Sequence, residues 1–399
     1  MSDLSPTHYS SAYHRWEPQV HAWNSISVGL LDSGFTVGVK DIINTADFST
    51  EMGSPAWEGF TPGNDARVVS KIKQAGGVIV GKTKTAEFAV HSHAETRNPH
   101  DLDRTPGTSS SGSAVAVATG MVPVALGTQT AGSIIRPASW CGVYAMKPSF
   151  GLIPRTGILK TADTLDTVGF FTDTPDKLRT MLEICRVDGR DYPNTRGLTK
   201  PRKVKSVGFI CPPCIADWPM YALKSFQNWV TRLSEFVDMK EIPWELESAY
   251  STHRVIYHKS LSYYFQQEMA GGRVSGIFKS QVEEGQSILP EKYQMALTQQ
   301  QDLATIADIM LSKVGVLVTL SSAGDAPLFD REQDAPRDTN PVWTLCGLPV
   351  INVPAFTSPE GLPFGVSIIA RKYHDYKLFD FLNVLVKAGL APSGPSPAL

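Results

Sequence analysis

The sequence predicts an α/β fold, and the order of its hydrophobic patterns carries this prediction. In the first third of the chain, segments with alternating apolar residues and segments with apolar residues at helical spacing follow one another. Residues 220–312 carry mostly helical patterns, and strand patterns return after them. We therefore expect the strands of the two ends to share one sheet, with the helical middle as an insertion.

The N-terminal elements place a lysine at the end of a strand. Phe35, Val37 and Val39 alternate with other residues, which is typical of a strand, and Lys40 follows them. The elements expected next are a helix over 65–76, a short buried strand over Gly77–Val80, a helix of small residues over Ser113–Met121 and a return strand over Pro123–Leu126.

The rest of the chain has fewer strand signals. Residues 160–200 show little periodicity. After them we expect helices over Tyr221–Val237, His253–Met269 and Pro290–Met310, and strands over Val314–Leu320, Val350–Pro354 and Phe364–Ile369. Residues 392–399 are rich in proline and serine, so we expect a disordered tail there.

The charge balance of the chain argues against nucleic acid and membranes as partners. The 399 residues include 37 basic and 39 acidic ones, for a formal net charge of −2. Such a balance gives no electrostatic attraction to nucleic acid or to a membrane surface. Apolar runs such as Val314–Leu320 are far shorter than a membrane span. We expect neither nucleic acid nor a membrane as a partner.

The cysteines predict a reducing compartment. Their number, 5, is odd, and they are scattered through a large chain. The N-terminus has no basic stretch followed by an apolar one, so we see no signal peptide and expect a cytoplasmic protein. Cys211 and Cys214 fit the pattern C-x-x-C, but no Cys or His follows them at zinc spacing. We interpret them as structural thiols and expect no metal site.

A nucleotide-binding motif is matched in letters only. Residues 76–83, GGVIVGKT, fit G-x-x-x-x-G-K-[ST]. In a P-loop the strand precedes the first glycine, but here the strand-like residues Val78, Ile79 and Val80 lie between the glycines. An extended segment cannot wrap its N–H groups around a phosphate, so we reject an ATP site here.

Two clusters of small and hydroxyl-bearing residues are candidates for a site. The first, Pro106–Ala114, leads into the small-residue helix, and the second, GTQTAGS, ends at Ser133. Taken alone, the first cluster is best explained as a serine cap of a helix. A helix followed by a return strand can, however, bring Ser109 and Ser133 to one sheet edge, beside Lys40.

These three side chains could form a catalytic relay. A serine hydroxyl is a weak nucleophile and needs a base. No histidine lies near Ser133 in the sequence, but a buried lysine can serve if desolvation lowers its pKa toward neutrality. A second serine could pass the proton from the nucleophile to the lysine.

The motifs that carry these residues resemble the amidase signature family. They are GVKD, which contains Lys40, RTPGTSSSGS, which contains Ser109, and GTQTAGSIIRP, which contains Ser133, together with GSPAW, MKPSFGLIP and GLPVINVPAF. The resemblance covers residues 17–154 and 346–371. The form GTQTAGSIIRPA is most similar to malonamidase-like members.

This resemblance implies a fold and an activity. The fold is a large mixed β-sheet covered by helices on both faces, as one domain over 1–391, with 160–340 varying with substrate. The activity is hydrolysis of a small-molecule amide through an acyl-serine, releasing ammonia or an amine, without a metal or organic cofactor. The alternative is an amidotransferase subunit that supplies ammonia to a partner, and a third reading is an inactive binding protein. We consider a homodimer as the assembly.

The resemblance also assigns roles to single residues. It makes Ser133 the nucleophile, Ser109 the bridging serine and Lys40 the base. The oxyanion hole falls on the backbone N–H groups of Thr130, Ala131, Gly132 and Ser133.

Three positions in these motifs raise separate questions. The family pattern places a cis peptide bond before Ser109, where Thr108 replaces a glycine. Ala131 also replaces a frequent glycine and requires a negative φ. Arg136 either binds a substrate carboxylate or forms an internal ion pair, and the sequence leaves both open.

Overall fold

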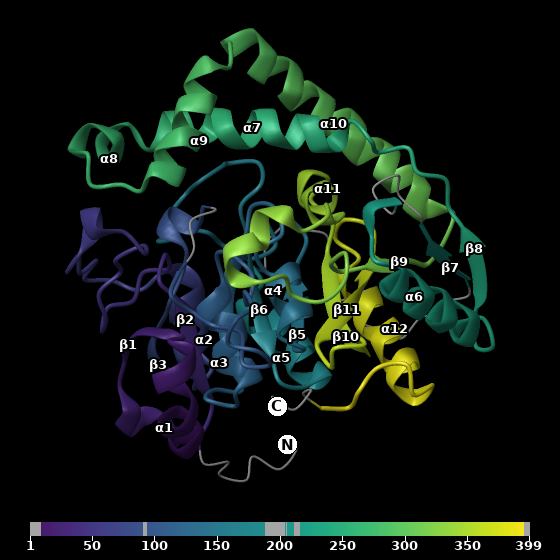
Figure 1. Cartoon of the computed structure of the whole chain (residues 1–399), viewed down its shortest axis with the longest axis horizontal. Coiled ribbons are helices and arrows are strands. Elements are labelled where there is room, and N and C mark those ends of the chain that lie inside the picture. Colours follow the sequence, from purple (N-terminus) through teal and green to yellow (C-terminus); the bar gives the residue numbers. More distant parts are fainter. Residues whose placement is uncertain (1–8, 91–93, 188–203, 205, 211–215, 395–399) are drawn as a thin grey trace.

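One mixed sheet runs through the molecule. The computed structural model describes residues 9–90, 94–187, 204, 206–210 and 216–394. Its 11 strands follow the order β1-β3-β2-β4-β6-β5-β10-β11-β9-β7-β8 (Figure 1). The strands are β1 (Trp23–Ile26), β2 (Thr36–Lys40), β3 (Val78–Thr83), β4 (Val124–Gln129), β5 (Tyr144–Lys147), β6 (Thr167–Thr172), β7 (Ser206–Phe209), β8 (Asp238–Glu241), β9 (Val316–Leu320), β10 (Val350–Thr357) and β11 (Pro363–Ile369).

Helices cover the sheet in two layers. On one face α3 lies against β2, β3 and β4, and α4 packs beside it on β5, β10 and β11. On the other face α5 contacts α2 and α12. The α-helices are α1 (Tyr9–Val20), α2 (Arg67–Gln74), α3 (Ser111–Ala118), α4 (Ile135–Trp140), α5 (Pro175–Cys185), α6 (Met220–Leu233), α7 (Ala249–Tyr264), α8 (Gln266–Gly271), α9 (Gly276–Ser287), α10 (Pro290–Ser312), α11 (Asn340–Leu345) and α12 (Asp375–Lys387).

The middle of the chain forms an arch over the sheet. Helices α9 and α10 each pack against α7, and so does α11. In Figure 1 the arch lies at the top of the molecule, with α11 between it and the strands. The arch therefore lies on the same side of the sheet as α11.

The predicted fold class is confirmed, and most predicted elements are present. The predicted elements of the first part are β2, α2, β3, α3 and β4, and those of the last part are β9, β10 and β11. Residues 220–312 are mostly helical, as expected, but β8 lies within them and β7 precedes them, and these two unexpected strands extend the sheet beyond β9. They are four residues each and show no long hydrophobic run, so periodicity did not reveal them. The helix expected over His253–Met269 is divided at Phe265, whose φ of −111° is not helical.

Other expectations are tested in part. Among the described residues, no helix combines the length and hydropathy that a bilayer crossing requires. The free thiols that the structure describes, Cys141, Cys185 and Cys346, are all buried. Cys211 and Cys214 lie outside the described residues, as do positions 395–399 of the expected tail. Within that tail, the carbonyl of Pro392 accepts a hydrogen bond from the hydroxyl of Tyr144.

The rejected nucleotide motif is a buried strand. β3 contains Val78–Thr83, so the GKT residues are extended and paired on both sides, with β1 and with β2. The side chain of Lys82 is fully buried, and its Nζ lies 3.1 Å from Oδ1 of Asp41. It also donates to Oγ1 of Thr50 at 2.6 Å. Lys82 therefore forms an internal ion pair, and the rejection of a P-loop is confirmed.

Replacing Lys82 by methionine is expected to destabilise the fold. The change leaves the buried Asp41 carboxylate without its cation, which typically costs about 3–5 kcal/mol in the free energy of unfolding. Urea denaturation measures this loss. The matched control is Lys73→Met, since Lys73 pairs with Asp47 and Asp65 but is partly exposed, and exposed pairs contribute about 0–1 kcal/mol. Equal losses in the two variants would contradict the assignment.

Candidate active site

Lys40 reaches the serine cluster because of the strand order. β2 runs parallel to β4, so the carboxyl ends of both strands lie at one edge of the sheet. Val39 pairs with Leu126, which places Lys40 beside the last residues of β4. The loop Thr130–Ser133 begins where β4 ends. The sheet thus brings the lysine to the start of this loop.

Three hydroxyl oxygens surround the amine of Lys40. Its Nζ lies 2.7 Å from Oγ of Ser109 and 3.0 Å from both Oγ of Ser110 and Oγ1 of Thr128. The side chain of Lys40 is fully buried. Burial lowers the pKa of Lys40 well below its ordinary value, and the Asp166 carboxylate raises this pKa by a smaller amount. The lowered pKa favours the neutral amine, the form that can accept a proton.

Ser110 occupies the N-cap position of α3 without capping it. Its side chain makes no capping hydrogen bond to the first turn of the helix. Its hydroxyl donates to the carbonyl of Thr128 at 3.2 Å, so its oxygen remains to accept an N–H of Lys40. The interpretation of the serine cluster as a simple helix cap does not fit this arrangement.

The backbone N–H groups of the loop Thr130–Ser133 have no hydrogen-bond acceptor among the described residues. Gln129 holds the chain that follows, since its Oε1 accepts the N–H groups of Ile134 and Ile135 at 2.8 Å and 3.0 Å. Ala131 is not among the residues with positive φ, as its methyl group requires. The loop therefore has the donors that an oxyanion site needs.

Ser133 lies in a segment that packs against the loop of Ser109. A Cβ added to Gly107 would lie 2.7 Å from Cα of Pro137 in α4, and Gly107 has a φ of +98°. Only glycine fits there, because the loop of Gly107 packs directly against α4, the helix that follows Ser133. Ser133 is 7% exposed, and within the described part of the chain its hydroxyl forms no hydrogen bond to Ser109 or Lys40. The structure thus joins Lys40 to Ser109 and places Ser133 in the adjoining loop.

One implication of the family resemblance is corrected. The peptide bond between Thr108 and Ser109 is trans, and no cis bond occurs among the described residues. The trans form is lower in energy by about 3 kcal/mol for bonds that do not precede proline. The hydroxyl of Ser109 lies within hydrogen-bonding distance of Lys40 in this form.

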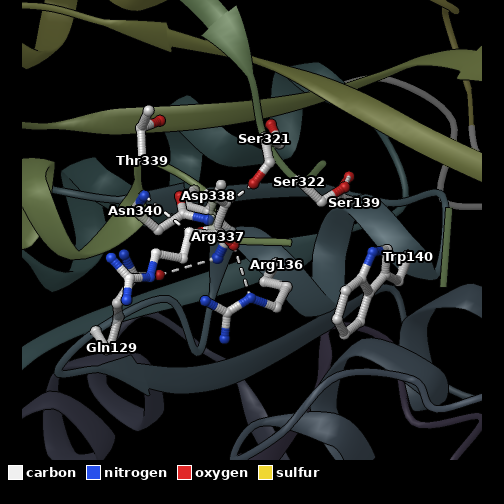
Figure 2. Close-up of polar contacts among 12 residues, drawn as sticks. Gln129, Arg136, Ser139, Trp140, Ser321, Ser322, Arg337, Asp338, Thr339 and Asn340 are labelled. Carbon is white, nitrogen blue, oxygen red and sulfur yellow. Dashed lines mark hydrogen bonds and ion pairs between the residues drawn. The ribbon is translucent and has the colours of Figure 1, made fainter. Parts of the chain in front are cut away.

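Arg136 forms an internal ion pair. Figure 2 shows its side chain directed at Asp338, and Nε donates to Oδ2 at 2.7 Å. The other oxygen of Asp338 accepts the N–H of Asn340 at 3.0 Å, and Asn340 donates to the carbonyl of Ser321 at 2.8 Å. A Cβ on Gly132 would lie 2.8 Å from Nη2 of Arg136, so the guanidinium covers the loop. One of the two roles left open for Arg136, the internal brace, is therefore present.

A cavity lies between this loop and the helical arch. It has a volume of about 890 Å³, which suits a small organic molecule. Its walls include Ala131 and Arg136 on one side and His253, Arg254 and Tyr257 of α7 on the other. Among the described residues, no group of His, Cys, Asp or Glu side chains is arranged to hold a metal ion.

Sequence reasoning missed the residues that hold the loop in place. His253 and Thr344 contact the carbonyl oxygens of Thr130 and Ala131, respectively. Both lie more than 100 residues from the loop and belong to no recognised motif, so only tertiary structure reveals them. Gln129 lies inside the motif GTQTAGS, so its place in this motif was a signal that the sequence offered; the structure shows that it is buried.

Comparison with known proteins places the chain in a class. The family model described as Amidase matches residues 25–379. One relative, a glutamyl-tRNA(Gln) amidotransferase subunit of Thermotoga maritima, is 30% identical over 407 residues, which cover 89% of this chain and 84% of that protein. The corresponding protein of a Sulfurihydrogenibium species is 40% identical over 182 residues, 44% of this chain and only 37% of that relative.

A solved structure agrees with the fold. The peptide amidase of Stenotrophomonas maltophilia superposes with a TM-score of 0.83 at 22% identity, covering 97% of this chain and 93% of that one. The match to the family model over most of the chain makes it an amidase-family enzyme. The chain belongs to the amidase family, the amidase signature enzymes.

Proposed function

We propose that this chain hydrolyses the C–N bond of a small-molecule amide through an acyl-serine on Ser133. The observation that carries the proposal is the contact of 2.7 Å between Nζ of the buried Lys40 and Oγ of Ser109. A neutral amine has two N–H groups and one lone pair. If Ser110 and Thr128 accept the N–H groups, the lone pair faces the hydroxyl of Ser109.

In the proposed mechanism, protons pass between Ser133, Ser109 and Lys40 as bonds to the amide carbon form and break. Ser109 gives its proton to Lys40 and takes that of Ser133, whose oxygen bonds to the amide carbon. The N–H groups of the loop Thr130–Ser133 stabilise the oxyanion. The C–N bond breaks as the proton returns to the leaving nitrogen, which departs as ammonia or an amine. Water then adds to the ester carbon by the same relay and releases the carboxylic acid.

Trapping the intermediate tests this proposal. The chain is incubated with malonamate, glutamine, biuret and an aryl amide, and intact-protein and peptide mass spectrometry follow. We expect an acyl mass on the peptide that contains Ser133 with at least one amide, and a hydroxamate when hydroxylamine is added. Turnover of an amide without an adduct or a hydroxamate would argue against an acyl-serine.

We further propose that Arg136 contributes to binding a substrate carboxylate. It lines the cavity, next to the loop that would hold the reacting carbonyl. Replacing Arg136 by glutamine should raise KM for malonamate about 10- to 100-fold, the usual loss of a charge-assisted hydrogen bond, and leave KM for the neutral malonamide nearly unchanged. Steady-state kinetics on both amides measures this difference.

A control variant distinguishes substrate binding by Arg136 from its role in holding the loop in place. Asp338→Asn keeps Arg136 but removes the carboxylate with which it pairs. If Arg136 only braces the loop, both variants lower kcat for the charged and the neutral amide alike. That outcome would remove the substrate role.

A second candidate function is that of an amidotransferase subunit, which supplies ammonia to a partner. It is favoured by two relatives named as amidotransferase subunits, whose matches cover 91% and 89% of this chain. Affinity purification of the tagged chain, followed by glutaminase assays with and without co-purified proteins, tests it. Glutaminase activity that requires a co-purified protein would support this function over the first.

The proposed enzyme would act as one domain over residues 1–391, since strands between Trp23 and Ile369 share one sheet. We propose a cytoplasmic homodimer as its state. Light scattering after gel filtration measures the mass in solution, and a monomeric mass would contradict the dimer.

A further inference from the structure

The carbonyl groups of the loop are bound one after another. Nε2 of His253 lies 2.8 Å from the carbonyl oxygen of Thr130. Oγ1 of Thr344 donates to the carbonyl oxygen of Ala131 at 2.7 Å. The carbonyl oxygen of Gly132 accepts the N–H of Arg136 at 2.9 Å. Three consecutive peptide groups are thus held by their oxygens.

Holding a carbonyl also orients the N–H group of the next residue. In a trans peptide the C=O and N–H bonds of one plane point in opposite directions. The oxygens of Thr130 and Ala131 therefore fix the N–H groups of Ala131 and Gly132 on the opposite side of the chain, where they have no partner among the described residues. A peptide that flipped would present a carbonyl in place of a donor.

We propose that His253 and Thr344 are positioning residues that keep the oxyanion loop in its donor-presenting form. This inference rests on the proposed acyl-serine function and deepens it. The first anchor comes from α7 and the second from α11, two helices that pack on each other. Helices α7 and α11 thus control the geometry of the catalytic loop, although they lie outside the motifs.

The surroundings of His253 suit such a role. A carbonyl oxygen can only accept, so Nε2 of His253 carries the proton. The side chain is buried, and its ring stacks on that of Tyr257 with centroids 5.8 Å apart and an interplanar angle of 17°. Both residues line the cavity together with Ala131. A substrate in the cavity would therefore contact the anchor and the loop at once.

Thr344 is itself held in place. Its Oγ1 accepts the amide N–H of Gln129 at 3.0 Å, so its own proton is directed to the carbonyl of Ala131. Gln129 also holds the N–H groups that follow the loop. Thr344, Gln129 and the start of α4 are consequently joined by hydrogen bonds. Because Thr344 lies on α11, Thr344→Val tests the inference without changing α7.

The test compares variants that remove an anchor with variants that retain it. His253→Leu and Thr344→Val lose the donor, whereas His253→Gln and Thr344→Ser keep one. We expect kcat to fall by roughly 10²-fold in the first pair, the usual cost of losing an oxyanion donor, with KM changed less than about threefold. The second pair should recover most of kcat. The probes are p-nitrophenyl acetate, whose burst of p-nitrophenolate reports acylation, and the amide of the panel that is turned over fastest.

The control is a buried neighbour on the same helix. Among the described residues, the hydroxyl of Thr252 hydrogen-bonds to Ser248 and Gln299 and makes no hydrogen bond to the loop, so Thr252→Val should retain wild-type kcat. Melting temperatures identify variants that do not fold. If His253→Leu does not fold, the comparison of Thr344→Val with Thr344→Ser tests the inference instead. Wild-type kcat in folded donor-free variants, while the wild-type chain forms the Ser133 adduct, would overturn the inference. A wild-type chain that forms no adduct would instead overturn the proposed function.

Discussion

Replacing Ser133 by alanine should abolish turnover of every amide that the wild-type chain hydrolyses. Removal of a nucleophilic serine from enzymes of this kind lowers kcat by roughly 10⁴-fold or more. The loop N–H groups and the cavity would remain, so we expect KM or the inhibition constant of a substrate analogue to change little. Steady-state kinetics together with mass spectrometry of the Ser133 peptide measures both effects.

The structure offers a matched control for Ser133. Ser111 lies in the other serine cluster, is buried, and its hydroxyl has no hydrogen-bond partner among the described residues. Ser111→Ala removes the same atom from the same region and should leave kcat and the acyl adduct unchanged. A Ser133→Ala variant that is as active as the Ser111 variant would disprove the nucleophile assignment.

Replacing Lys40 by methionine should lower kcat by about 10²- to 10⁴-fold, the range typical of a lost general base. The pH dependence gives a second, independent sign of the same role. Since burial lowers the pKa of Lys40, the base is neutral above that lowered pKa and protonated below it. Activity of the wild-type chain should therefore rise with pH through this pKa, and a pH–rate profile of kcat measures it.

The same pKa affects stability, and its sign can be worked out. The unfolded chain binds a proton at Lys40 up to the ordinary pKa of 10.5, while the folded chain loses this proton at a lower pH. Between the two values the unfolded state holds more protons, so the free energy of unfolding rises with pH. In Lys40→Met this contribution should be absent, which urea denaturation at several pH values tests.

Lys147 serves as the control for Lys40. It is also fully buried, on β5, and burial lowers its pKa to about 7. Its amine donates to the carbonyls of Pro148 and Leu348 and does not contact a serine hydroxyl of the site. Lys147→Met should change stability but retain the acid limb of the pH–rate profile. If Lys40→Met keeps the wild-type kcat and the same fall in activity at low pH, Lys40 is not the general base.

Local sequence determined much of the fold and the core of the candidate site. Alternation identified β2 and so placed Lys40 at a strand end, and small residues with hydroxyls marked both loops. These loops can be recognised in the sequence because their structure permits few residue types. Gly107 must be glycine because its backbone lies against Pro137, and serine is needed where hydroxyl oxygens surround the lysine amine. The P-loop motif could also be rejected from local sequence, because the strand-like residues Val78, Ile79 and Val80 lie between its glycines.

Tertiary structure alone decided what holds these residues in place. The ion pair of Arg136 is made with Asp338, which lies 202 positions away in the chain. His253 and Thr344 contact the loop from helices α7 and α11, and the sequence pattern of neither helix marks these two residues. A hydrogen bond to a backbone carbonyl can be made by any donor that the fold brings within about 3 Å. Such an anchor leaves no spacing or motif, because its partner is an atom that every residue has.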